Sequence, residues 1–163
     1  MIITPKVRVD HLAIARRYVA RENDWPLAPR FDPNERWYHR LAAENDYEVW
    51  LLTWLPGQGT DLHDHGGSAG AFVVVSGQLT EWTVATTAGA VAGADRPRLV
   101  NATIAAGAGR WFGSHHIHQI TNDGDRPAVS VHVYGPALKT MTRYQFDGDR
   151  LRIASIDRAG VQW

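Results

Sequence analysis

The stretch Trp54-Leu-Pro-Gly-Gln-Gly-Thr-Asp-Leu-His-Asp-His65 connects two short segments that are expected to be extended. Residues 47–55 are rich in aromatic and β-branched side chains, which favour a strand. Pro56-Gly57-Gln58-Gly59 then predicts a turn, because Pro and Gly supply backbone conformations that strands do not use. Beyond His65 an apolar run over residues 71–75 ends at Ser76-Gly77. The stretch therefore lies within a series of short strands.

The pattern of short strand and turn continues to the end of the chain. An Ala/Gly-rich loop is expected over 86–95, and Asp147-Gly148 marks a hairpin turn between the last two strands. The expected strands cover residues 47–55, 71–75, 79–85, 99–104, 117–121, 129–134, 142–146 and 151–156. Many short strands separated by Gly, Pro and Asp indicate a β-sandwich or β-barrel.

The N-terminal part of the chain predicts helices instead. Asp10 can cap a helix that runs to Glu22, and a second helix is expected from Asp32 to about Asn45. The second start is indicated by Asp32 followed by Pro33, since Asp suits the N-cap and Pro suits the first helical position.

Composition limits both the domain organisation and the function. A length of 163 residues suits one domain, and 17 basic against 17 acidic residues argue against a nucleic-acid partner. Neither a signal segment nor an apolar run long enough for a membrane is present, so we expect no membrane partner and a cytoplasmic location. The absence of cysteine excludes disulfides and cysteine zinc sites. We expect a single domain over 1–163, with a helical layer over about 1–45 and a small β-barrel over 46–163.

Histidines cluster in the middle of the chain. On a strand, residues i and i+2 share a face, so His63 and His65 point the same way, as do His116 and His118. Two imidazoles from one strand and one from a neighbour form a nitrogen set that suits iron, copper, nickel or zinc. The alternative is that these are ordinary surface or core histidines. The second cluster, some fifty residues after the first, favours a metal.

A polar row alternates with valines near the C-terminal end of the barrel segment. Ser130, His132 and Tyr134 occupy alternate positions of one predicted strand, so they share a face. Hydroxyl and imidazole groups both donate and accept, and such a row can form a chain of hydrogen bonds. The alternative is the solvent-facing side of an antiparallel strand. The residue types favour a functional row.

Two motifs carry a resemblance to a known family. Gly57-x5-His63-x-His65-x4-Gly70-x6-Gly77 resembles the first motif of the cupin superfamily, which normally has Glu where Gly70 stands, and His118-x3-Asn122 resembles the second. Loss of that Glu with three histidines kept is typical of the thiol dioxygenases. The stretch 54–65 and the stretch 127–136 both resemble the cysteine dioxygenases. The resemblance covers roughly residues 35 to 146 and implies a cupin-type jelly-roll barrel.

The resemblance implies roles for particular residues. Ferrous iron would be held by His63, His65 and His118, and Ser130, His132 and Tyr134 would form a relay. His116 shares a face with His118 and is the alternative third ligand, but only His118 has the His-x3-Asn spacing. Some members of the family crosslink a cysteine to the active-site tyrosine. This chain has no cysteine, so its Tyr134 is expected to be unmodified.

Arg40 is the candidate for binding a substrate carboxylate, because a planar guanidinium can pair with both carboxylate oxygens. It lies near the Trp37 and Leu41 side of the second predicted helix, and it matches the carboxylate-binding arginine of the family. The alternative is a surface pair with Glu44, four residues later.

The implied reaction joins both atoms of O2 to the sulfur of a small thiol acid, giving a sulfinic acid. L-cysteine is the leading substrate. Other thiols remain open, namely 3-mercaptopropionate, mercaptosuccinate, cysteamine and ergothioneine. A cupin that binds a metal or small molecule without catalysis is the alternative of a different class. The sequence does not indicate an oligomeric state.

Overall fold

The computed structural model describes residues 8–87, 96–148 and 150–158, which form mainly β-strands. Helix α1 (His11–Val19) and a short 3-10 helix (Glu22–Asp24) precede all the strands. The strands are β1 (Tyr38–Ala43), β2 (Glu48–Trp54), β3 (Leu62–His63), β4 (Ala69–Ser76), β5 (Gln78–Thr87), β6 (Arg96–Ala105), β7 (Gly109–Phe112), β8 (His118–Thr121), β9 (Ala128–Gly135), β10 (Thr140–Phe146) and β11 (Leu151–Arg158). Residues 88–95, in the loop expected over 86–95, lie outside the described residues.

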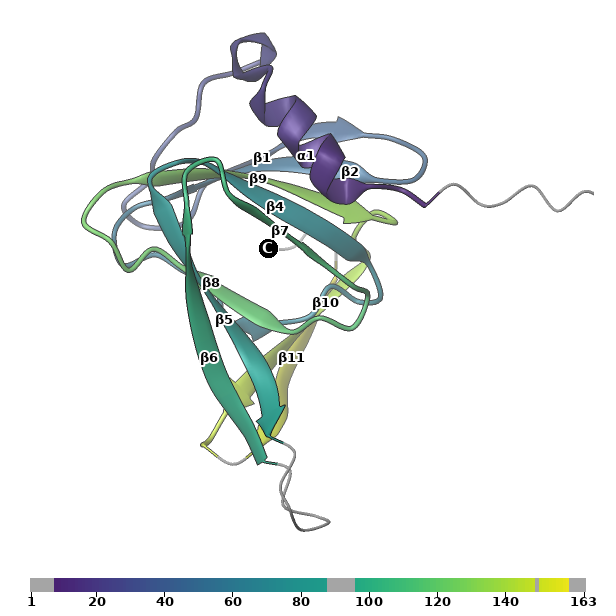
Figure 1. Cartoon of the computed structure of the whole chain (residues 1–163), viewed down its shortest axis with the longest axis vertical. Coiled ribbons are helices and arrows are strands. Elements are labelled where there is room, and N and C mark those ends of the chain that lie inside the picture. Colours follow the sequence, from purple (N-terminus) through teal and green to yellow (C-terminus); the bar gives the residue numbers. More distant parts are fainter. Residues whose placement is uncertain (1–7, 88–95, 149, 159–163) are drawn as a thin grey trace, which may run out of the picture.

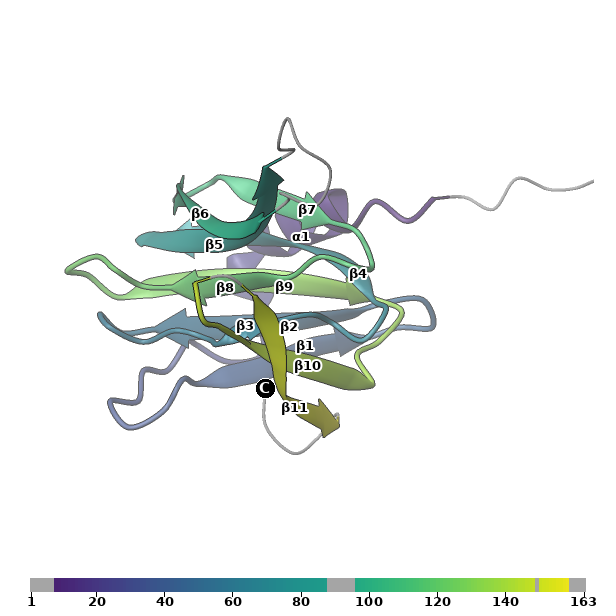
Figure 2. The same cartoon turned by 90° about the horizontal axis from the view of Figure 1, so that it is seen from below.

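Two antiparallel sheets form the body of the molecule. One has the strand order β1-β2-β9-β4-β7, and the other has the order β11-β10-β3-β8-β5-β6. In Figure 1 the first sheet lies above the second, with α1 on its outer side. Figure 2, seen from below, places β10 and β11 in front of the first sheet. The expected mainly β architecture with a short helical N-terminal layer is confirmed.

Alternation along the strands divides the first sheet into two faces. Val129, Val131 and Val133 of β9 point outward and pack with Ile14 and Ala15 of α1. The side chains between them point inward, toward the second sheet, into an inner core that includes Trp54, Phe72 and Ile120. The inner face carries the candidate site, and the outer face holds the helix.

The helix expected from Asp32 to Asn45 is wrong, because β1 occupies the second half of that segment. Asp32 does accept a hydrogen bond from Asn34 N–H at 2.8 Å, but in a local turn and not at a helix cap. Tyr38 of β1 lies opposite Leu52 of β2. Pairing with a buried neighbouring strand outweighs the local start signal, and in the described part of the chain no helix follows residue 24.

The first helix begins where it was expected. The Asp10 side chain accepts a hydrogen bond from Ala13 N–H at 2.9 Å, as an N-cap does. The helix ends at Val19, and residues 22–24 form the 3-10 turn. Among the described residues, no helix has the length and apolar character needed to cross a membrane.

Candidate metal centre

Three histidines meet between the two sheets. His63 on β3 lies directly opposite His118 on β8, and His65 follows β3 by two residues. Their ring centroids are 4.9 to 5.0 Å apart, and one nitrogen from each ring lies within 4.8 Å of the others. All three side chains are buried. The structure therefore brings together the three residues that the sequence predicted as metal ligands.

Hydrogen bonds set the ring tautomers of two of these histidines. His63 Nδ1–H donates to the backbone carbonyl of Asp61 at 2.8 Å. His118 Nδ1–H donates to Glu81 Oε1 at 2.9 Å. Because an oxygen acceptor requires a protonated Nδ1, Nε2 of both rings carries a free lone pair. Those two nitrogens are available to a cation.

His65 tests whether a metal fits. It is 1% exposed, and within the part of the chain that the structure describes neither of its ring nitrogens has a hydrogen-bond partner. An unpartnered buried polar group is costly, and a metal ion at the convergence of the three rings would bind one of the two His65 nitrogens and so remove part of that cost. Burial lowers the pKa of His63 and His65 well below 6.5, and it also lowers that of His118. All three are thus neutral near pH 7, which is the form that binds metals.

The position normally held by a cupin Glu has no room for a side chain. Gly70 on β4 lies opposite Tyr134 on β9. A Cβ atom there would come within 2.3 Å of the Val133 carbonyl and 2.8 Å of the Phe112 ring. Any carboxylate ligand at this position is sterically excluded. The candidate centre therefore offers three neutral nitrogens.

His116 belongs to a second, overlapping cluster with Glu81 and His118. Its Nε2 lies 3.1 Å from Glu81 Oε1, the same oxygen that accepts from His118. Burial alone would raise the pKa of Glu81, but the hydrogen bonds from the two rings outweigh it and lower the pKa to about 2. Glu81 is thus a carboxylate that anchors both rings. The Nε2 atom of His116 is directed at this anion, and His116 is not one of the three histidines that converge at the centre.

A hydrogen-bonded chain runs beside the histidines along the inner face of β9. Trp54 Nε1–H donates to Ser130 Oγ at 2.9 Å. Ser130 Oγ lies 2.9 Å from His132 Nε2, and His132 Nδ1 lies 3.2 Å from the Tyr134 hydroxyl. An indole can only donate, so the buried Ser130 hydroxyl, which accepts from it, is left to donate to His132. His132 Nδ1–H then donates to Tyr134.

The direction of this chain decides what Tyr134 can do. Its oxygen accepts from His132, which leaves its own O–H free to donate into the barrel interior. The Tyr134 ring lies 5.1 Å from the His65 ring, so that proton is held near the candidate centre. Burial raises the Tyr134 pKa above its usual value and lowers that of His132 to about 3. Tyr134 is therefore a protonated donor, and His132 is neutral.

Comparison with known proteins agrees with this geometry. The model of a family described as cysteine dioxygenase type I matches residues 3–147. The chain belongs to that family. Cysteine dioxygenase type 1 of Homo sapiens is 25% identical over 134 residues, which cover 78% of this chain and 64% of the human protein. The chain thus spans less than two thirds of the length of this relative.

Solved structures share the cupin fold with this cysteine dioxygenase family member. A protein with a double-stranded β-helix domain from Klebsiella pneumoniae has a TM-score of 0.52 at 19% identity, covering 77% of this chain and 90% of its own. An RmlC-like cupin protein from Desulfovibrio desulfuricans has a TM-score of 0.52 at 16% identity, covering 71% of this chain and 95% of its own. These similarities establish the fold alone, and they confirm the expected cupin-type barrel.

Arg40, the predicted carboxylate partner, lies on a strand and not on a helix. Its register places it opposite Trp50 of β2, on the inner face, with its guanidinium 5.8 Å from the Trp50 ring. One guanidinium nitrogen lies 3.9 Å from Glu48 Oε2, and 54% of the side chain is exposed. The alternative helical pair with Glu44 depended on the wrong helix. The structure thus places Arg40 at the rim of the barrel, beside the carboxylate of Glu48.

Arg36 is a cation that the sequence analysis missed. It precedes β1 by two residues, and its guanidinium lies 4.9 Å above the ring of the fully buried Trp54. Its positive charge counteracts the rise in the Tyr134 pKa and helps to lower the pKa of His63. Alternation with Tyr38 and Arg40 could have revealed it, had the segment been read as a strand.

Two buried glutamates were also missed. Glu81 follows the buried Leu79 by two residues, so strand alternation could have placed it inside the barrel. Glu48 is 3% exposed and accepts a hydrogen bond from Leu138 N–H at 2.8 Å. An acidic residue on an apolar face is the signal for both.

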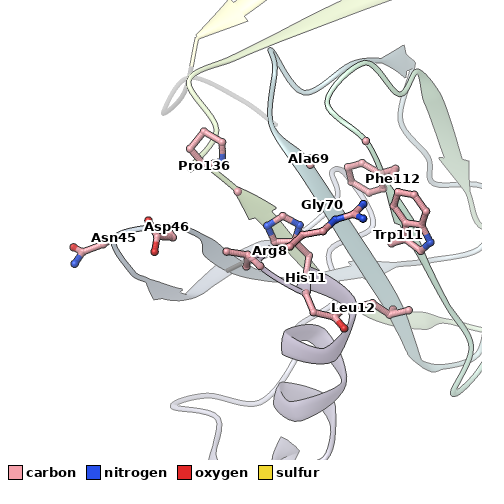
Figure 3. A pocket seen from close by; sticks show the side chains of 14 residues that line it. Arg8, His11, Leu12, Asn45, Asp46, Ala69, Gly70, Trp111, Phe112 and Pro136 are labelled. Atoms are coloured by element: carbon pink, nitrogen blue, oxygen red, sulfur yellow. The ribbon is translucent and has the colours of Figure 1, made fainter. Parts of the chain in front are cut away.

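A surface cavity of about 1100 Å³ lies outside the barrel, beside the start of α1. Figure 3 shows His11 facing Gly70 there, with Trp111 and Phe112 along one side and Asp46 along another. Phe112 separates this cavity from the centre, because its ring stacks on His65 at 4.6 Å. None of the three histidines or of the relay residues lines the cavity.

Proposed function

We propose that this protein is an iron(II)-dependent thiol dioxygenase that converts a small thiol carboxylic acid, with L-cysteine as the leading substrate, to its sulfinic acid. The observation that carries the proposal is the meeting of three neutral histidine nitrogens, without a carboxylate ligand, beside a Tyr134 hydroxyl that is left to donate into the barrel interior. Membership of the cysteine dioxygenase family supports the same chemistry.

The residues that would hold the iron are His63, His65 and His118. When bound there, ferrous iron would take the substrate as a thiolate and activate O2. Three neutral ligands would leave the ion more positive than a ligand set with a carboxylate, which favours binding of an anionic sulfur. The reaction balances as RSH + O2 giving RSO2H, so it needs no further oxidant or reductant.

The relay of Ser130, His132 and Tyr134 would hold a proton at the Tyr134 hydroxyl oxygen. Because Tyr134 stays protonated and points its O–H toward the site, it can stabilise negative charge that develops on the reacting oxygen. The neutral His132 keeps that donor oriented. A cupin that only binds a metal or a small molecule has no need of such an oriented donor.

The substrate's carboxylate would need a cationic partner at the barrel rim. Arg40 is the residue that the family resemblance assigns to this role. Arg36 is a second candidate, because it is packed on Trp54 and its charge acts on Tyr134. The proposed partners are a thiol and O2, and a cytoplasmic location remains a prediction.

The test is oxygen consumption by protein loaded with Fe(II), with cysteine, 3-mercaptopropionate, mercaptosuccinate, cysteamine and ergothioneine supplied separately. We expect a sulfinic acid product that carries both atoms of labelled O2. A different preferred thiol would retain the dioxygenase and change its substrate. Iron binding without oxygen uptake on any thiol would support the non-catalytic alternative.

A further inference from the structure

The three candidate ligands differ in what holds their second nitrogen. His63 donates to a neutral backbone carbonyl, and His65 has no hydrogen-bond partner among the described residues. Only His118 donates to a carboxylate, Glu81, at 2.9 Å. A hydrogen bond to an anion is roughly twice as strong as one between neutral groups, and it makes the imidazole a better electron donor. His118 is therefore electronically distinct from the other two ligands.

The Glu81 carboxylate is buried and held in a fixed position by its neighbours. Its side chain is 7% exposed, and Oε1 accepts from both His118 and His116. Its other oxygen lies 3.8 Å from Arg110 Nε. Contacts from three side chains hold the carboxylate in place on β5. A buried anion with this many donors keeps its charge and its position.

The surroundings of the three histidines explain why the charge of Glu81 affects the metal centre although Glu81 is not a ligand. Gly70 leaves no room for a carboxylate that touches a metal at this centre. Glu81 is joined to the centre through the His118 ring, so its negative charge would act on a bound ion through that ligand. Low-dielectric surroundings strengthen such an effect compared with water.

We propose that Glu81 is a positioning residue of the metal centre, which holds His118 in the Nδ1-protonated tautomer and supplies the negative charge that the three neutral ligands lack. His116 and Arg110 would in turn hold Glu81. This inference rests on the metal site of the proposed function, but not on the identity of the thiol or on turnover.

The test compares Glu81→Gln with Glu48→Gln. Both glutamates are buried and accept hydrogen bonds, but Glu48 bonds the Leu138 backbone and touches none of the three histidines through the described contacts. Affinity for Fe(II) would be measured by anaerobic calorimetry, and affinity for Co(II) by its visible spectrum. We expect Glu81→Gln to weaken both by about 10–100-fold. Glu48→Gln should change neither by more than about threefold.

The midpoint potential of the bound iron separates a positioning role from a structural one. Removing a negative charge disfavours the ferric ion more than the ferrous ion, so the potential of Glu81→Gln should rise. A tenfold larger loss of ferric than of ferrous affinity corresponds to about 59 mV. His116→Ala keeps the hydrogen bond that His118 donates to Glu81, and it should shift both affinity and potential less than Glu81→Gln does.

Two results would overturn the inference. One is a folded Glu81→Gln protein with wild-type metal affinity and potential. The other needs no variant: nitrogen NMR of the wild-type, zinc-loaded protein should show a proton on His118 Nδ1, and a bare Nδ1 would contradict the assignment. Absence of thiol oxidation would sink the proposed function but would leave these metal measurements unaffected.

Discussion

At the scale of single residues, the two arginines of the barrel rim differ in their surroundings. Arg40 is more than half exposed and lies 3.9 Å from Glu48, so much of its charge is already compensated or screened. Arg36 is packed on Trp54, and its charge acts on Tyr134 and His63. Surroundings that exclude water favour the second residue as the partner of a substrate carboxylate.

Paired substitutions decide between them. Losing a largely desolvated pair costs roughly 2–5 kcal/mol, so Arg36→Gln should reduce kcat/KM for cysteine by about 30-fold or more, mainly through KM. An exposed pair contributes about 1 kcal/mol at most, so Arg40→Gln should cost about fivefold or less. Steady-state oxygen uptake measures both, with the exposed Arg16→Gln as control. The kcat/KM for cysteamine, which lacks a carboxylate, should be unchanged by all three substitutions. A larger loss of kcat/KM for Arg40→Gln than for Arg36→Gln would instead identify Arg40 as the partner of the substrate carboxylate.

Tyr134 offers a test of the relay. Tyr134→Phe removes one hydroxyl and keeps the ring that packs near His65. Turnover should fall about 10–100-fold, because a donor to developing charge is lost. Iron content, measured by metal analysis, should be unchanged, since Tyr134 is not a ligand. Turnover equal to that of the wild type would leave the relay without a catalytic role.

At the scale of elements, strand periodicity accounts for the parts of the site that the sequence predicted. His63 with His65, and Ser130 with His132 and Tyr134, lie two residues apart, so one face of each segment carries the chemistry. The valines of β9 take the other face and pack with α1. Such patterns are local and can be read from the chain alone.

Pairing between distant segments could not be predicted in the same way. Trp37 and Leu41 are four residues apart, a spacing that places two residues on one face of a helix and equally on one face of a strand. In the structure both pack against the outer face of the first sheet. Only the partner strand β2 decides between the two, and that contact is not local. Because a helix and not a strand was expected over this segment, the inward position of Arg36 was missed as well.

The contact between β4 and β9 can be tested through Gly70. A methyl group at this position would come within 2.3 Å of the Val133 carbonyl, which belongs to the backbone and cannot rotate away. Gly70→Ala should therefore lower the free energy of unfolding by about 1–3 kcal/mol and displace Tyr134, which lies opposite. Urea denaturation would measure the first effect. Gly113→Ala is the matched control, because a Cβ there meets nothing within 4 Å, and equal losses in the two variants would contradict the steric argument.

At the scale of the whole molecule, burial inside the barrel keeps four histidines in their neutral form. Burial lowers the pKa of His63, His65, His118 and His132 below 6.5, and that of His132 to about 3. Once the pH falls below 6.5, these histidines bind protons in the unfolded chain but remain neutral in the folded chain. Below that pH the unfolded state binds more protons, so the stability of the metal-free protein must fall as the pH decreases.

The expected slope can be stated for each group. One histidine that is protonated only in the unfolded state contributes about 1.4 kcal/mol per pH unit below 6.5. Urea denaturation of the metal-free protein should therefore give a nearly constant free energy of unfolding above pH 7 and a steep decrease between pH 6.5 and 5. Glu81, whose pKa is lowered to about 2, extends the loss below pH 4.5 with the same sign. A bound metal should add stability at pH 7 that disappears over the same interval, because protons and the ion compete for the same nitrogens. A flat profile between pH 7 and 5 would mean that these histidines take up protons inside the folded barrel, which is incompatible with a ready set of metal ligands.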